Sequence, residues 1–225
     1  NQEMIIVFSA GNSGPGANTI GTPGTGKNVL TVGAAENVHS FATANGGGNA
    51  TGADGCGIDD AGANNANDVI SFSSRGPTDD GRIKPDIQAP GTHITGMTFV
   101  TTTSSGTGTA EASYRADGVC GGSSSNFFPI GQQWYTASSG TSHSAPAVAG
   151  GAALVHQQFI NNPSYLAAGR NPAGGVAPSP AMVKAYLTNS ARYMTGVSAN
   201  DTLPSNSQGV GMMNLGMAFD GVPRV

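Results

Sequence analysis

The most constraining feature of this sequence is an apolar pattern with helical spacing over residues 142–160. It predicts a helix with one face in the core, formed by Ala145, Val148, Ala149, Ala152, Val155 and Phe159. Pro146 is expected in the first turn, where a proline is tolerated because its missing N–H has no intrahelical partner. A second helix is predicted to start at Ser179 (N-cap) and Pro180 (first helical position). Its face comprises Met182, Val183, Tyr186 and Leu187.

Short apolar runs bounded by Gly, Pro and Asn predict buried strands in the first part of the chain. Residues 4–10 are expected to form a fully buried strand and residues 28–35 a second one. Residues 69–73 and 87–89 are shorter candidates. Strands that alternate with buried helices indicate an α/β domain with a largely parallel sheet.

The composition excludes several classes of partner. Charged residues make up 10% of the 225, and the net charge of −4 gives no reason to attract nucleic acid or an anionic membrane. No apolar run is long enough to span a membrane. Few lysines and abundant Ser, Thr, Asn and Gly favour a secreted protein. Since the chain opens directly into a strand pattern, we expect the N-terminal part of the domain to lie upstream.

Two stretches with little to bury, residues 43–67 and 101–131, are predicted to be loop insertions in one domain over residues 1–225. Cys56 lies in the first insertion and Cys120 in the second, so a disulfide would join them, and the alternative is two buried thiols. The first insertion and its border also carry carboxylates. Their order is not that of a calcium loop, which favours a solvated loop over a metal site: Asp54, Asp59, Asp60 and Asp68.

Ser142 is a candidate nucleophile because it lies where Gly140-Thr141 leads into the first predicted helix. Free backbone N–H groups and the helix dipole at such a position favour developing negative charge. The alternative is that Thr141 or Ser142 is only an N-cap. Asn12 ends the first predicted strand, where its amide is either a turn cap or a donor to an oxyanion.

Together these motifs resemble the subtilisin-like serine proteases, or subtilases. The resemblance rests on four ordered blocks: Ala10-Gly11-Asn12; Phe72 to Pro77 with Lys84 to Gly91; Gly140-Thr141-Ser142 to Gly150; and Gly209-Val210-Gly211-Met212-Met213-Asn214. It implies a three-layer α/β fold with a mostly parallel sheet, of which the N-terminal part is missing. It also implies an endopeptidase that acts on polypeptides through an acyl-enzyme.

The resemblance also assigns roles to individual residues. Ser142 would attack the scissile carbonyl, and the Asn12 amide would hold the oxyanion together with the Ser142 N–H. Gly21 would form the floor of a roomy specificity pocket, and a cis Thr22–Pro23 bond is expected beside it. The other substrate-binding positions are Ser9, Ala10, Gly11, Gly140 and Thr141.

The triad is incomplete in this chain, because no Asp-Ser/Thr-Gly and no His-Gly-Thr segment occurs. His93 and His156 are expected to be structural or solvated, and His39 is not followed by Gly-Thr either. His143 stands where the family usually has Met, which removes an oxidation-prone thioether from beside the serine. We expect its ring to point away from Ser142. Without a base the Ser142 hydroxyl is a weak nucleophile, so the chain alone is predicted to be inactive.

No catalytic cofactor is expected, but the resemblance implies a weak structural site for calcium or sodium. Its ligands would be the carbonyls of Gly24, Gly26 and Val29 with Asp86. Two other functions stay open. One is a pseudoprotease or binding module, which needs neither Ser142 nor Asn12. The other is a different serine hydrolase, which would need a Gly-x-Ser-x-Gly elbow that the sequence lacks.

Overall fold

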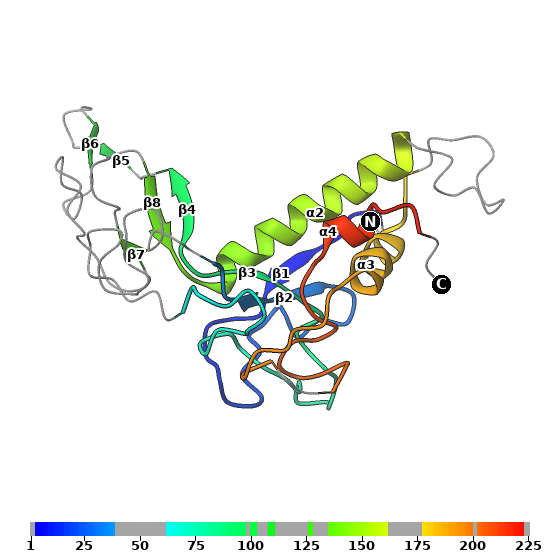
Figure 1. The fold of residues 1–225 in the computed structure, drawn as a ribbon, viewed down its shortest axis with the longest axis horizontal. Helices are drawn as coiled ribbons and strands as arrows, with labels where there is room; N and C mark the ends of the chain where they lie inside the picture. The colour runs from blue at the N-terminus through cyan, green and yellow to red at the C-terminus, as the bar shows by residue number, and fades with distance from the viewer. Residues whose placement is uncertain are drawn as a thin grey trace.

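A three-stranded parallel sheet forms the centre of the computed structural model (Figure 1). The structure describes residues 3–38, 62–97, 135–161, 177–199 and 202–222, together with the backbone of residues 100–102, 108–110 and 126–127. The sheet has the order β1-β2-β3, with Val7 opposite Leu30 and Val32 opposite Ile87. Its strands are β1 (Val7–Ser9), β2 (Leu30–Ala35) and β3 (Ile87–Pro90).

Helices cover one face of this sheet. The long helix α2 (Thr141–Asn161) packs against all three strands, and α3 (Pro180–Asn189) packs against α2. The short helix α4 (Leu215–Ala218) follows beside α3 (Figure 1). Apolar side chains from strands and helices meet in one core: Leu30, Val32, Ile87, Ala89, Val148, Ala152, Val155, Phe159, Val183 and Leu187.

The opposite face of the sheet is covered by loop segments. Because side chains alternate along a strand, β2 directs Leu30 and Val32 toward the helices and Ala35 toward the loops. Ala35 belongs to a second buried cluster with Val69, Met194, Ala199 and Met212. The sheet with its helices confirms the α/β class predicted from the sequence. Among the described residues, the layer behind the sheet contains no helix.

Antiparallel strands lead from β3 toward the start of α2. Strands β4 (Ile94–Met97), β8 (Tyr135–Ser138) and β7 (Asn126–Phe127) form a sheet in the order β4-β8-β7. Strands β5 (Val100–Thr102) and β6 (Gly108–Ala110) form a two-stranded ribbon. The second predicted insertion thus includes short strands. Most of the first insertion lies outside the described residues, as do both cysteines.

The predicted strands agree with the structure except at two places. Residues 28–35 and 87–89 correspond to β2 and β3, but residues 69–73 contribute only a bridge from Val69 to Ala35. The first strand is shorter than predicted and is not fully buried. Met4 is 65% exposed and Ile6 39%. The physical reason is that β1 is an edge strand whose only ladder among the described strands is with β2.

Both predicted helices form, with one correction. Ser179 caps α3 by accepting a hydrogen bond from the N–H of Met182, and Pro180 is at its start, as predicted. Pro146 lies in the second turn of α2, not the first, because the helix begins at Thr141. The Ser142 carbonyl therefore has no N–H four residues later to bond.

No helix in the described ranges has the length and apolar character needed to cross a membrane.

Gly91 follows β3 at a close contact between sheet and helix. A Cβ at this position would lie 2.3 Å from Ser144 Oγ and 2.6 Å from Ala34 Cβ. We therefore expect Gly91→Ala to lower the free energy of unfolding by about 1–3 kcal/mol, since the added methyl group forces its neighbours apart.

Urea denaturation measures this loss. Gly96→Ala is the matched control, because a Cβ on Gly96 would meet nothing within 4 Å. Equal stability of the two variants would contradict the packing argument.

Candidate active site

The end of β1 and the start of α2 are joined through Asn12 and Thr141. The Thr141 N–H and the Thr141 hydroxyl each donate to Asn12 Oδ1, at 2.9 Å in both cases. The Gly11 N–H donates in turn to Thr141 Oγ1 at 3.2 Å. Thr141 is fully buried. These three bonds bring together segments that lie about 130 positions apart in the chain.

The same bonds orient the Asn12 side chain. Its oxygen is occupied by two donors, so its amide nitrogen is the end left for another partner. Asn12 Nδ2 lies 3.4 Å from the position that a Cβ on Gly140 would occupy. The NH₂ group therefore lies beside the residues that immediately precede Ser142.

Ser142 is the second residue of α2 and is exposed. Its N–H has no acceptor within the helix, because the first four N–H groups of a helix lack one. Among the described residues, no hydrogen bond to its hydroxyl is found. A free hydroxyl, a free N–H and the positive end of the helix dipole thus coincide at this residue.

The turn before Ser142 is held by the segment that follows β3. The Gly140 N–H donates to Gly91 O at 2.7 Å, and the Ser144 hydroxyl donates to Pro90 O at 3.2 Å. The N–H of His93 donates to Ser139 Oγ at 2.9 Å. The start of α2 is therefore fixed to the central sheet, so Ser142 has a rigid support.

The residues expected to line a substrate pocket lie side by side. The Gly21 N–H donates to Ala10 O at 2.8 Å, which joins the pocket-floor segment to the end of β1. Gly11 has a φ of 107°, and a Cβ there would lie 2.9 Å from Ser74 Oγ, so this position requires glycine. The Thr22–Pro23 bond is cis, as predicted.

In the part of the chain that the structure describes, no hydrogen bond links a histidine to the Ser142 hydroxyl. His143 Nε2 lies 2.8 Å from Ser138 Oγ, so its ring points toward β8. His93 is buried behind the turn, and His156 lines an apolar groove along α2. His39 lies outside the described residues.

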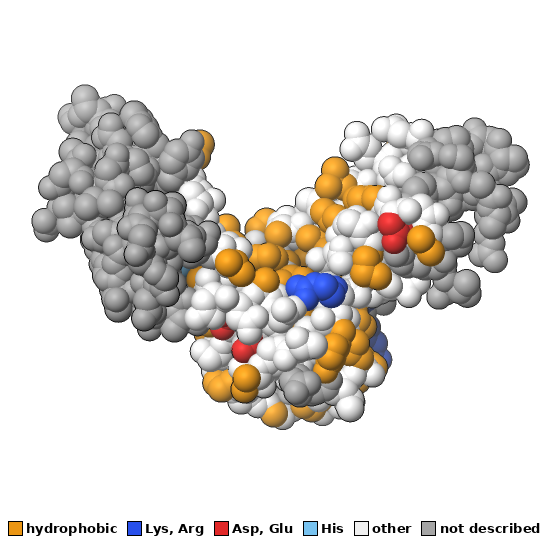
Figure 2. All heavy atoms as spheres, in the orientation of Figure 1, with side chains coloured by type: hydrophobic (Ala, Val, Ile, Leu, Met, Phe, Trp, Pro, Cys, Tyr) orange, Lys and Arg blue, Asp and Glu red, His pale blue; other side chains and the backbone are white. Residues whose placement is uncertain are grey.

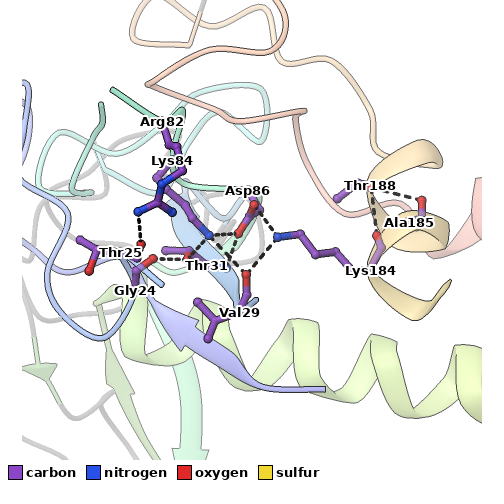
Figure 3. Close-up of polar contacts among 10 residues, drawn as sticks. All are labelled: Gly24, Thr25, Val29, Thr31, Arg82, Lys84, Asp86, Lys184, Ala185 and Thr188. Carbon is purple, nitrogen blue, oxygen red and sulfur yellow. Dashed lines mark hydrogen bonds and ion pairs between the residues drawn. The ribbon is translucent and has the colours of Figure 1, made fainter. Parts of the chain in front are cut away.

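At the implied cation site, the structure places two lysines (Figure 3). Asp86 Oδ2 is 2.6 Å from the ammonium of Lys84, and Asp86 Oδ1 is 2.8 Å from that of Lys184. Both ammonium groups also donate to Val29 O, at 3.3 and 3.0 Å. Gly24 O accepts from the Thr31 hydroxyl. No bond from these lysines to Gly26 O is found in the described ranges.

Neither lysine was predicted from the sequence to lie at this site. The signal for them was their rarity: the whole chain contains three lysines, and two converge on one carboxylate. Burial lowers the pKa of the Lys84 ammonium, while the hydrogen bond and charge of Asp86 act in the opposite direction. Elsewhere in the described ranges, no group of three or more His, Cys, Asp or Glu side chains suits a metal ion.

Asp68 is the one described member of the predicted acidic loop set. Its Oδ1 accepts hydrogen bonds from the N–H groups of Val69 and Ser198, each at 2.8 Å. It therefore connects two backbone segments. The other three carboxylates of that set lie outside the described residues.

The family model and the similar proteins both identify the same protein family. The model of the Subtilase family matches residues 1–211. Serine protease AprX of Bacillus subtilis is 36% identical over 157 residues, which are 69% of this chain and 26% of AprX. Pyrolysin of Pyrococcus furiosus is 40% identical over 92 residues, 39% of this chain and 6% of pyrolysin. The chain thus spans about a quarter or less of these relatives.

Two solved protease structures match this chain over most of its length. Sphericase has a TM-score of 0.49 at 22% identity, over 92% of this chain and 46% of its own. The prenylagaramide maturation protease PagA has a TM-score of 0.49 at 20% identity, over 97% of this chain and 51% of its own.

The role of Thr141 is testable without any activity. Thr141→Val removes a buried hydroxyl that bonds both Asn12 and Gly11. We expect the free energy of unfolding to fall by about 1–2 kcal/mol, the size of one or two net hydrogen bonds. Chemical denaturation measures the loss. Thr141→Ser keeps the hydroxyl and is the control, so a similar loss in both variants would contradict the bonding argument.

Proposed function

Because this chain belongs to the subtilase family, we propose that it forms the nucleophile-bearing part of a secreted serine endopeptidase. Ser142 is the nucleophile, and Asn12 is one oxyanion donor. The observation that carries the proposal is the orientation of the Asn12 carboxamide. Its oxygen is bonded to Thr141, which leaves Nδ2 available beside Ser142.

In the proposed reaction, the Ser142 hydroxyl attacks the carbonyl carbon of a peptide bond while a histidine takes its proton. The carbonyl oxygen becomes an oxyanion, which accepts hydrogen bonds from Asn12 Nδ2 and the Ser142 N–H. Collapse of this intermediate expels the amine, which receives the proton from the histidine, and leaves an acyl-enzyme on Ser142. Water then releases the acid by the same steps.

The histidine and aspartate of the triad are proposed to lie upstream of this chain in the full-length protein. Three observations support this. The chain covers 26% of AprX, and its own sequence lacks both family segments. Among the described strands β1 pairs only with β2, which leaves its other edge for a further strand. With that part absent, the chain is expected to be inactive.

An apolar surface supports the same proposal. A groove of about 560 Å³ lies between the segment leading into β1 and α2, and its apolar lining includes Met4, Ile5, Ala149, Ala153 and Val183. Figure 2 shows hydrophobic side chains gathered in the hollow of the molecule where α2 crosses in Figure 1. Leu154 on this helix is 46% exposed. Burying such a surface requires further protein, and the upstream part of the domain is the proposed cover.

The proposed substrates are polypeptides. Ser9, Ala10 and Gly11 are the proposed walls of the specificity pocket, with Gly21 at its floor. Small residues at these four positions favour a large apolar or aromatic side chain. Gly140 and Thr141, which the sequence predicted to bind substrate, are both buried. Their proposed role is to hold the turn that presents Ser142, not to contact the substrate.

A fluorophosphonate probe tests the nucleophile and the missing base together. We expect the full-length protein to become labelled at Ser142, as read by mass spectrometry, because an activated serine attacks phosphorus. Ser142→Ala should abolish the labelling. Ser13→Ala is the control, because Ser13 is an exposed serine close to the same site.

Residues 1–225 alone should stay unlabelled under the same conditions, since no base is present. Rapid labelling of this fragment would refute the proposal that residues 1–225 lack the base that activates Ser142. Absence of labelling in the folded full-length protein would favour a pseudoprotease or binding module instead.

Asn12→Asp tests the oxyanion donor, because it removes the amide N–H groups and keeps an oxygen that can accept from Thr141. We expect kcat to fall about 10²–10³-fold with little change in KM, a magnitude taken from the corresponding deletion in subtilisin itself. Steady-state kinetics on a peptide substrate with the full-length protein measures it. If the variant has a raised KM and an unchanged kcat, Asn12 would contribute to substrate binding, which contradicts a role confined to the transition state.

A further inference from the structure

Asp86 lies in a cluster where donors from the protein bind both of its carboxylate oxygens (Figure 3). The Lys84 ammonium uses its three N–H groups on Asp86 Oδ2, Thr31 Oγ1 and Val29 O. Lys184 extends from α3 to Asp86 Oδ1 and to the same carbonyl of Val29. These contacts occupy both carboxylate oxygens.

Backbone groups complete the arrangement. The Thr31 N–H donates to Asp86 Oδ2 at 2.7 Å, and the Thr31 hydroxyl donates to Gly24 O at 2.6 Å. Of the four ligands that the resemblance implies for a cation, Gly24, Val29 and Asp86 are therefore already bound by hydrogen-bond donors. A metal ion would have to compete with these donors for the oxygens.

The charge of the cluster opposes a metal ion as well. Two ammonium groups face one carboxylate, which leaves an excess of one positive charge. The Lys84 side chain is 3% exposed and that of Asp86 is 15% exposed. At such a degree of burial, water screens the repulsion between an incoming cation and the ammonium groups only weakly.

We propose that the ammonium groups of Lys84 and Lys184 replace the structural cation of this family site in this protein. The site binds no calcium or sodium, and its stabilising charge is part of the chain. Asp86 is the common partner of two lysines from different elements, so the replacement ties the loop before β2, the entry to β3 and helix α3 to one carboxylate.

The site itself is tested by diffraction from crystals of the full-length protein. One crystal is soaked in calcium chloride and another in thallium(I), a heavy stand-in for a monovalent cation. We expect no anomalous density within bonding distance of Asp86 in either crystal. A peak bonded to Asp86 and Val29 O would overturn the proposal.

The lysine contribution is tested by thermal and chemical unfolding of Lys184→Met. The side chain of Lys184 is 31% exposed, so the variant keeps Lys84 beside Asp86 and is expected to fold. We expect its folding equilibrium constant to fall about tenfold, because a hydrogen bond to a charged group is lost. Lys27→Met is the matched control, since Lys27 is the remaining lysine and is exposed.

Metal sites elsewhere in the full-length protein do not affect the comparison, because they are the same in both variants. Equal stability of Lys184→Met and Lys27→Met would overturn the proposal. Neither experiment depends on peptidase activity, so the outcome is separate from that of the proposed function.

Discussion

The contact between Asn12 and Thr141 is the interaction on which the site depends. One carboxamide oxygen accepts both the N–H and the hydroxyl of the first residue of α2, and that hydroxyl also accepts the N–H of Gly11. The end of a strand and the start of a helix are thereby held in one arrangement. Since the amide has only one oxygen, its nitrogen is left as the donor. The bonds from Thr141 thus hold the amide nitrogen beside the residues before Ser142, where the proposed oxyanion would form.

The scaffold beneath this contact is built from close backbone approaches. Gly91 brings the residues after β3 within reach of Gly140 and Ser144, so the turn that presents Ser142 is fastened to the sheet by main-chain and side-chain bonds. A bulkier residue at Gly91 would move the helix start relative to Asn12. The precision of the site therefore rests on small residues that carry no chemistry themselves.

Local patterns in the sequence were sufficient to predict β2, β3, α2 and the cap of α3, because each pattern reports burial or capping within one segment. The pairing of Asn12 with the start of α2 was expected only from the family motifs. Two features of the structure could not be predicted from local patterns in the sequence. The exposure of Met4 depends on what lies beside β1, and the meeting of Lys84 with Lys184 joins positions 100 residues apart that share no local pattern.

In our proposal, the lysine cluster explains why a ligand set inferred from a family need not hold its ion. A ring of carbonyls with one carboxylate attracts any cation, and an ammonium group is a compact cation with three donors. Once Lys84 is buried beside Asp86, the attraction is satisfied within the chain, and Lys184 adds a second donor from α3. The stabilisation of a fold by a bound metal ion grows with the logarithm of the free ion concentration above Kd, whereas a tethered ammonium group is always present. The backbone of such a site is thus preserved while its dependence on solution ions is lost.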